Sequence, residues 1–217
     1  DSVLLVSTGT KLANIGEITF TENGVETQLI SKADFTPSVD ETTPEYAAYA
    51  KITQTLADIE QEYSALVETA VASTPYDLTV NDPDTGERAV RNAETNLGDL
   101  CADAYRIRTG ADAGLINGGG VRASIAAGDM TYGDIIEVQP FGNSLCVLEV
   151  TGQQLLDCLE MGARYYPEEN GAFMQVSGLT YEIHSYIKSS VTTDESGNFT
   201  GVSGEYRVKN VLVGGEP

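Results

Sequence analysis

Histidine is almost absent from this sequence, since His184 is the only one among 217 residues. A single histidine cannot supply the imidazole ligands of a dinuclear metal centre, and no cysteine–histidine cluster has the spacing of a zinc site. His184 lies in the alternating run LTYEIHSY, which predicts a strand and a structural role. We therefore expect no transition-metal site of the usual kind in this chain.

Cysteine is scarce as well. The three cysteines, Cys101, Cys146 and Cys158, are too few and too irregularly spaced to form a disulfide framework. Each lies within an apolar pattern, so we expect all three to be buried thiols.

Positive charge is the third shortage. The chain has 12 basic and 33 acidic residues, which gives a formal net charge of −21. So acidic a surface repels polyanions, which argues against a nucleic-acid polymer or an anionic membrane as a partner. A small anionic ligand is still compatible if a few arginines gather at one place. No apolar run reaches the ~20 residues of a membrane span, and we expect no signal peptide in this stretch of sequence.

The first part of the chain divides into two regions. Residues 1–34 contain short strand patterns separated by Gly and Asn-Gly turns, which we interpret as the closing strands of a domain whose body lies upstream. Residues 35–74 predict a linker helix, which Thr43 can cap, with Pro44 and Glu45 suiting its first turn. Its narrow apolar stripe favours a connector lying on one neighbouring surface, although half of a coiled coil would look similar.

Residues 75–217 form the third region, in which strand and helix patterns alternate. The sequence TNLGDLCADAYRIRTG predicts a helix that ends at Gly110, and Thr151 with Gln154 forms a capping box that opens another helix. Residues 113–116 and the segment SLCVLEV, residues 144–150, predict buried strands. Hairpins are expected after residue 175. We therefore predict an α+β fold, in which a mixed β-sheet packs with helices and a long linker helix precedes it.

The segment INGGGVRAS carries the first candidate site. It places Gly118, Gly119 and Gly120 between Asn117 and Arg122. Bare backbone suits a tight turn, and it equally suits an anion that approaches the main chain. The segment lacks both the GxGxxG pattern of dinucleotide-binding folds and the Lys-Ser/Thr of a phosphate-binding loop.

Two more arginines, Arg88 and Arg91, precede the predicted helix that begins near Asn96. Arginines beside loop-to-helix junctions of an acidic chain indicate an anion site, because the guanidinium fork matches phosphate and carboxylate oxygens. Ordinary ion pairing at the surface is the alternative.

The segment QPFGNS, residues 139–144, presents an aromatic ring on a turn. Phe141 could stack on a flat ligand and Asn143 could contact its polar edge, whereas a phenylalanine that plugs the end of a sheet is the alternative. Glycines, arginines and an exposed ring together describe a site for a flat anion, and a nucleotide fits.

Four segments, RNAETNLGDLCADAYR, INGGGVRASIAAGDMTYGDI, VQPFGNSL and FMQVSGLTYEI, closely resemble the C-terminal domain of the 5′-nucleotidase family, in the family's order. The opening TGTKLANIGEITF resembles the end of that family's metallophosphoesterase domain, and residues 43–72 its interdomain helix. The resemblance implies an upstream catalytic domain of the same polypeptide, which holds two divalent metal ions and performs hydrolysis. No cofactor is then expected on this chain.

The resemblance also implies roles for individual residues. Arg91 and Arg122 match arginines that hold phosphate or ribose, Asn117 matches a nucleoside contact, Phe141 a ring that stacks on the base, and Asn143 its polar neighbour. Glu87 stands where some members have an arginine. The family's second ring and its ribose-binding aspartate match no residue before 217.

We therefore expect the nucleotide-binding domain of an extracellular, cell-surface or periplasmic phosphohydrolase. A non-catalytic binding module with the same fold is the competing hypothesis, and an interaction protein that uses the linker helix is a third.

Overall fold

The computed structural model describes residues 5–9, 13–34, 42–43 and 46–217, and it divides into two compact units, Asp1–Glu62 and Tyr63–Pro217. In the first unit, β1 (Asn14–Thr21) and β2 (Gly24–Ser31) form an antiparallel hairpin. Most side chains of the two strands are exposed.

Helix α1 (Tyr46–Val67) runs across the division between the units, and none of its residues is buried. Its first-turn signals are only partly described. The backbone N–H of Tyr46 donates to the carbonyl of Thr43 at 3.1 Å, while Pro44 and Glu45 lie outside the described residues. None of the helices in the described part of the chain is long and apolar enough to cross a bilayer.

The second unit confirms the predicted α+β fold. Its helices are α2 (Asn96–Thr109), α3 (Tyr132–Val138), α4 (Gly152–Ala163) and the single 3-10 turn η1 (Gly118–Gly120). Its strands are β3 (Ala70–Thr74), β4 (Gly114–Asn117), β5 (Gly128–Thr131), β6 (Met174–Ser177), β7 (Leu179–Ile183), β8 (Val191–Thr193), β9 (Phe199–Val202) and β10 (Val208–Val213).

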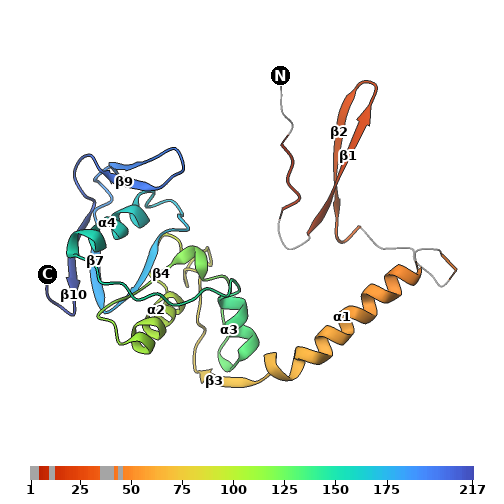
Figure 1. Ribbon diagram of the computed structural model, residues 1–217, viewed down its shortest axis with the longest axis horizontal. Coiled ribbons are helices and arrows are strands. Elements are labelled where there is room, and N and C mark those ends of the chain that lie inside the picture. The colour runs from red at the N-terminus through yellow and green to blue at the C-terminus, as the bar shows by residue number, and fades with distance from the viewer. Residues whose placement is uncertain (1–4, 10–12, 35–41, 44–45) are drawn as a thin grey trace. The chain divides into compact units, whose positions relative to one another are not determined.

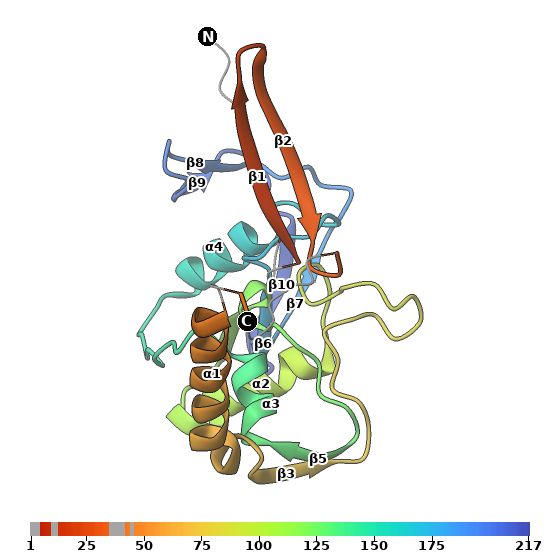
Figure 2. The same ribbon diagram turned by 90° about the vertical axis from the view of Figure 1, so that its right-hand side faces the viewer.

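These strands pair in two-stranded antiparallel ladders, β3 with β5, β4 with β6, β7 with β10 and β8 with β9. Figure 2 shows β3 and β5 side by side. The expected hairpins after residue 175 are partly formed, because β8 and β9 make a hairpin while β6 and β7 turn to different partners.

Two apolar clusters form the core of this unit. The first gathers Leu97 and Ala102 of α2 with Ile116 of β4 and with Val90 and Val121 of the adjoining loops. The second lies between α4 and the pair β7–β10, which are neighbours in Figure 1, and contains Leu159, Ala163, Leu179 and Val208. The loops that carry the candidate site leave from the first cluster.

The helix boundaries follow the sequence signals. Thr95 caps α2 by accepting from the backbone N–H of Gly98, and Gly110 ends the helix with φ of 69°. The predicted capping box of Thr151 and Gln154 opens α4, which ends at Ala163.

The strand predicted over residues 144–150 is wrong. This segment is extended, but it pairs with no described strand, and Leu145, Val147, Leu148 and Val150 are all exposed. An apolar run forms a strand only where a neighbour supplies the ladder hydrogen bonds. Cys146 lies in the same segment, so its predicted burial is wrong too.

Candidate functional site

The buried side-chain amide of Gln175 holds the loop that carries Arg91. Gln175 of β6 is 1% exposed. Its Nε2 donates to the carbonyls of Val90 at 3.0 Å and Ala93 at 2.6 Å, and its Oε1 accepts from the N–H of Thr95 at 3.0 Å. The amide thus satisfies three backbone groups just before α2, and it determines where Arg91 leaves the loop.

The glycine triplet packs against this loop. A Cβ at Gly118 would lie 1.8 Å from the Val90 carbonyl oxygen, and one at Gly119 would lie 2.8 Å from that of Gly171. The N–H of Gly118 donates to Phe173 at 2.6 Å and that of Gly119 to Gly171 at 2.9 Å. The close approach of neighbouring backbone therefore accounts for both glycines. Gly120 completes the turn and is buried.

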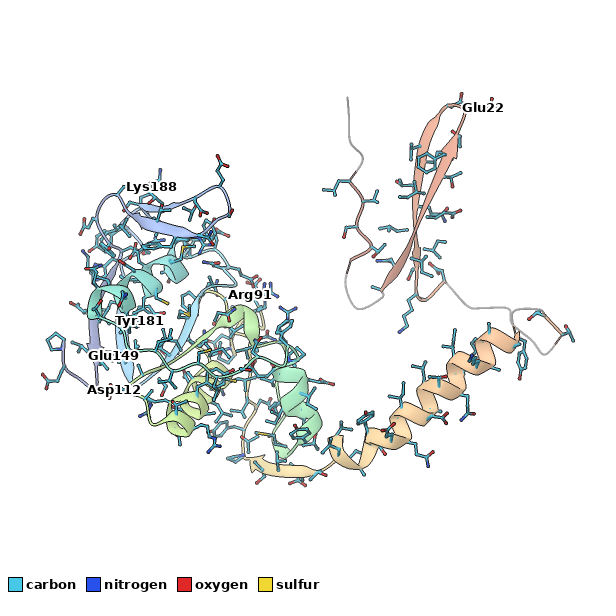
Figure 3. The ribbon with its side chains drawn as sticks, in the orientation of Figure 1. Glu22, Arg91, Asp112, Glu149, Tyr181 and Lys188 are labelled. Atoms are coloured by element: carbon cyan, nitrogen blue, oxygen red, sulfur yellow. The ribbon has the colours of Figure 1, made fainter. Side chains whose placement is uncertain are left out.

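Three arginines converge beside this turn. Figure 3 shows Arg91 next to η1, in agreement with the close approach of its Cα to Gly118. Burial lowers the pKa of Arg91, and the positive charges of Arg88 and Arg122 lower that pKa further, while Glu169 opposes them. The guanidinium still stays protonated. These charge interactions show that segments 31 positions apart in the sequence meet here.

The three arginines differ in their partners. Arg88 forms a two-pronged ion pair with Glu169, in which its Nε donates at 2.7 Å, and Arg88 holds the pKa of that carboxyl below its usual range. Surface ion pairing, the alternative for these arginines, thus applies to Arg88. Neither Arg91 nor Arg122 has an ion pair with any described acidic residue, and the buried Nε of Arg91 has no hydrogen-bond partner.

Phe141 displays its ring beside Arg122. The side chain is 58% exposed, which excludes a plug at the end of a sheet. The Arg122 guanidinium carbon lies 5.7 Å from the ring centroid, within the range of a cation–π contact. The backbone explains this placement, since the N–H of Arg122 donates to Val138 at the end of α3, three residues before Phe141. Asn143 follows in the exposed segment.

Asn117 lies on the other side of the turn, at the end of β4. Its Nδ2 donates to the Gly171 carbonyl at 2.9 Å, and Arg122 Nη1 donates to the Gly119 carbonyl at 3.3 Å. The site therefore has two cations without a described ion-pair partner, one exposed ring and one anchored amide around the turn. Such a set can hold a small anion with a flat part.

Residues 169–171, which contact this turn and the arginines beside it, were not identified from the sequence. Glu169 binds Arg88, the buried Asn170 donates its N–H to the Arg91 carbonyl at 2.9 Å, and Gly171 accepts from both Gly119 and Asn117. The available signal was Gly171 in GAFMQV, because a glycine shortly before the hairpins expected after residue 175 indicates a loop.

The remaining titratable groups do not form a metal site. Within the part of the chain that the structure describes, no group of three or more His, Cys, Asp or Glu residues is arranged to hold a metal ion. His184 follows β7 and contacts Tyr186 Oη at 2.8 Å and a Glu182 carboxylate oxygen at 3.0 Å. Burial raises the pKa values of the Cys101 and Cys158 thiols.

Comparison with known proteins gives one consistent result. Residues 70–217 match the family described as 5′-nucleotidase, C-terminal domain. A 5′-nucleotidase from Vibrio parahaemolyticus is 45% identical over 101 residues, which is 46% of this chain and 18% of that protein. The silent protein UshA(0) of Salmonella typhimurium is 35% identical over 140 residues, covering 64% of this chain and 24% of that protein.

A solved structure agrees with these relatives. The crystal structure of the 5′-nucleotidase precursor from Thermus thermophilus has a TM-score of 0.57 and 31% sequence identity, and the match covers 88% of this chain and 38% of that one. The chain thus spans less than two-fifths of the length of each of these three proteins.

Proposed function

The chain belongs to the 5′-nucleotidase C-terminal domain family, and from this membership we propose that its region 75–217 binds a nucleoside phosphate and presents it to a catalytic domain of the same polypeptide. Arg91 and Arg122 hold oxygens of the phosphate or ribose, and Phe141 stacks on the base. Asn117 and Asn143 contact polar atoms of the nucleoside.

One observation carries this proposal. Two guanidinium groups without a described carboxylate partner lie at one turn beside an exposed aromatic ring, in a chain with a net charge of −21. An unpaired pair of like charges is unfavourable by itself, and a bound anion relieves it. The ring adds preference for a base over bare phosphate, because stacking is worth about 1–3 kcal/mol per base.

The chemistry of hydrolysis belongs to the catalytic domain in this proposal. That domain holds two divalent metal ions, which stabilise the attacking and leaving oxygens of the phosphoryl group when bound. Residues of the present chain bind and orient the nucleotide. We place the whole protein outside the cytoplasm, at the cell surface, in the periplasm or in the medium.

The experiment is a binding measurement on the complete protein. Replacing Phe141 by Ala should weaken AMP affinity by roughly one to two decades, since the stacking contribution is lost. Tyr76→Ala is the matched control, because Tyr76 is 59% exposed and lies outside the site. Equal affinities of the two variants in isothermal titration calorimetry would refute the stacking role. Phosphate release by the complete protein distinguishes the enzyme from a binding module without catalysis.

A further inference from the structure

A second group of cations lies near the C-terminal end of α4. Arg164, Lys188 and Arg207 line one hollow of about 560 Å³. None of the ten described residues that line it is acidic, and none belongs to the candidate nucleotide site. Figure 3 shows Lys188 well apart from Arg91. Three of the chain's 12 basic residues therefore line this hollow. The acidic residues of the chain are far more numerous, yet none of the described ones is in the lining.

The two arginines are built into the structure. Arg207 is 4% exposed, and its Nη1 donates to the carbonyls of Ala163 at 3.1 Å and Tyr166 at 2.9 Å. Nη1 of Arg164 donates to the Met161 carbonyl at 2.7 Å. The Nε atoms of both arginines are buried without a hydrogen-bond partner. Leaving a buried donor unsatisfied is unfavourable, so neither guanidinium has its full set of hydrogen bonds.

The charges of these groups are also uncompensated. None of Arg164, Lys188 and Arg207 forms an ion pair with a described acidic residue. The buried carboxylate of Glu160 accepts from the backbone N–H groups of Arg207 at 3.1 Å and Val208 at 2.8 Å, and it makes no ion pair with the guanidinium. The bonds to the carbonyls of Ala163 and Tyr166 explain why Arg207 is buried, but they neutralise none of the three charges.

Aromatic rings complete the lining. Tyr165 lies under the Arg164 guanidinium, whose carbon is 4.5 Å from the ring centroid. Tyr186 is 82% exposed, and its hydroxyl is held by His184 at 2.8 Å. Guanidinium groups match the oxygens of a phosphate, and exposed rings offer faces to a flat group.

We propose that this hollow is a second ligand site, which takes a small molecule carrying both a phosphate and a flat ring. Its volume suits such a ligand, since small-molecule sites measure about 300–1,000 Å³. The proposal is independent of the nucleotide site, because it uses none of the same residues. The segment that begins at Arg164 continues to Glu169 and Gly171, which support Arg88 and Asn117, so the two sites share one connecting loop.

The test is a titration of the 217-residue chain with phenyl phosphate, followed by amide chemical shifts in NMR. The Arg122→Ala background is used, because the nucleotide site could bind the same probe. We expect shifts centred on residues 185–191. Lys188→Glu should weaken the binding by about tenfold, since a charge-assisted contact to phosphate is lost. Lys51→Glu makes the same charge change on α1 and should leave the affinity unchanged.

A second variant tests the aromatic part. Tyr186→Leu should weaken binding of phenyl phosphate by roughly threefold or more and leave binding of inorganic phosphate unchanged, because only the former stacks. The amide spectrum of each variant also reports whether it is folded. The absence of shifts at residues 185–191, or equal affinities for the Lys188→Glu and Lys51→Glu variants, would overturn the proposal.

Discussion

Arg91 and Arg122 form no ion pair with a described acidic residue, although the sequence contains 33 acidic residues. Their neighbour Arg88 shows the contrast, because the Glu169 carboxylate already accepts from both Nε and Nη2 of its guanidinium. Sequence position alone does not separate these arginines. The difference arises from Glu169, whose carboxylate pairs with Arg88. Arg122 donates instead to the Gly119 carbonyl, and the buried Nε of Arg91 has no hydrogen-bond partner.

We predict that Arg122→Lys in the complete protein weakens AMP affinity by roughly tenfold. Lysine keeps the charge but loses the planar fork that binds two oxygens at once, and a charge-assisted hydrogen bond is worth about 1.5–3 kcal/mol. Arg88→Lys is the control and should have the smaller effect, because Glu169 already occupies that side chain. Calorimetric titration measures both, and a larger loss for Arg88→Lys would contradict the assignment.

Gln175 is the residue on which the site's backbone depends. We predict that Gln175→Leu lowers the free energy of unfolding by roughly 3 kcal/mol, because the Val90 and Ala93 carbonyls and the Thr95 N–H lose their partner. The exposed Gln153, which binds Asp157 and Tyr206, provides the control. Gln153→Leu should cost less than about 1 kcal/mol in the same urea titration. Similar costs for both variants would show that the buried amide has no special role.

The residue scale also shows what the sequence could predict. Phe141 and the arginines could be identified from the sequence. An aromatic residue is unusual on a turn, and clustered arginines are unusual in a chain with so few basic residues. Gln175 was not identifiable, since a glutamine in a strand pattern does not reveal that it faces the interior. Its burial depends on Gly98, where a Cβ would lie 2.2 Å from Gln175 Oε1. That contact joins residues 77 positions apart.

At the scale of elements, α2 carries an acidic residue, Asp99, whose charged form is disfavoured by burial. Burial first, and then the charges of Glu94 and Asp103, raise the pKa of Asp99 to about 6. The folded chain therefore keeps this proton up to about pH 6, whereas the unfolded chain loses it near the ordinary value of 3.8. Between these values the folded state binds more protons, so the contribution of Asp99 to stability falls as pH rises from about 4 to about 6.

We predict that Asp99→Asn removes this contribution. Relative to the unaltered chain, the variant should gain stability as pH rises from about 4 to about 7, because Asn has no charge to desolvate. Urea unfolding of both chains at four pH values across this range gives the difference at each pH. A difference that stays constant would show that Asp99 titrates alike in the folded and unfolded states.

Element boundaries were predictable where local chemistry sets them and unpredictable where partners do. The caps of α2 and α4 follow from Thr95, Gly110 and the Thr151–Gln154 box. The segment 144–150 has the composition of a strand, yet it lacks a ladder partner among the described residues. In α2, the apolar residues Leu100 and Ile107 are exposed, which the composition of the helix does not reveal. Pairing and facing depend on elements that are distant in sequence.

At the scale of the whole molecule, charge and family membership point in the same direction. A net charge of −21 opposes polyanionic partners, while cations gather at the η1 turn and at the hollow beside α4. The family match covers residues 70–217, and the chain spans 18% and 24% of the curated relatives described above. The proposed division of labour between binding and catalysis within a longer polypeptide accounts for both facts.

This division of labour predicts that the 217-residue chain alone hydrolyses no nucleotide, whatever divalent metal is added. Two-metal hydrolysis needs ions held about 3.5–4 Å apart, and the described residues provide no group of three or more metal ligands. The ring nitrogens of His184, the only histidine of the sequence, contact Glu182 and Tyr186, and among the described residues they bind no serine or cysteine that could serve as a nucleophile. The measurement is phosphate release from AMP and UDP-glucose in the presence of manganese, cobalt or zinc. The purified chain must be free of nucleotidases from the expression host. Turnover that copurifies with the chain and disappears in Arg122→Ala would mean that this domain performs the chemistry itself.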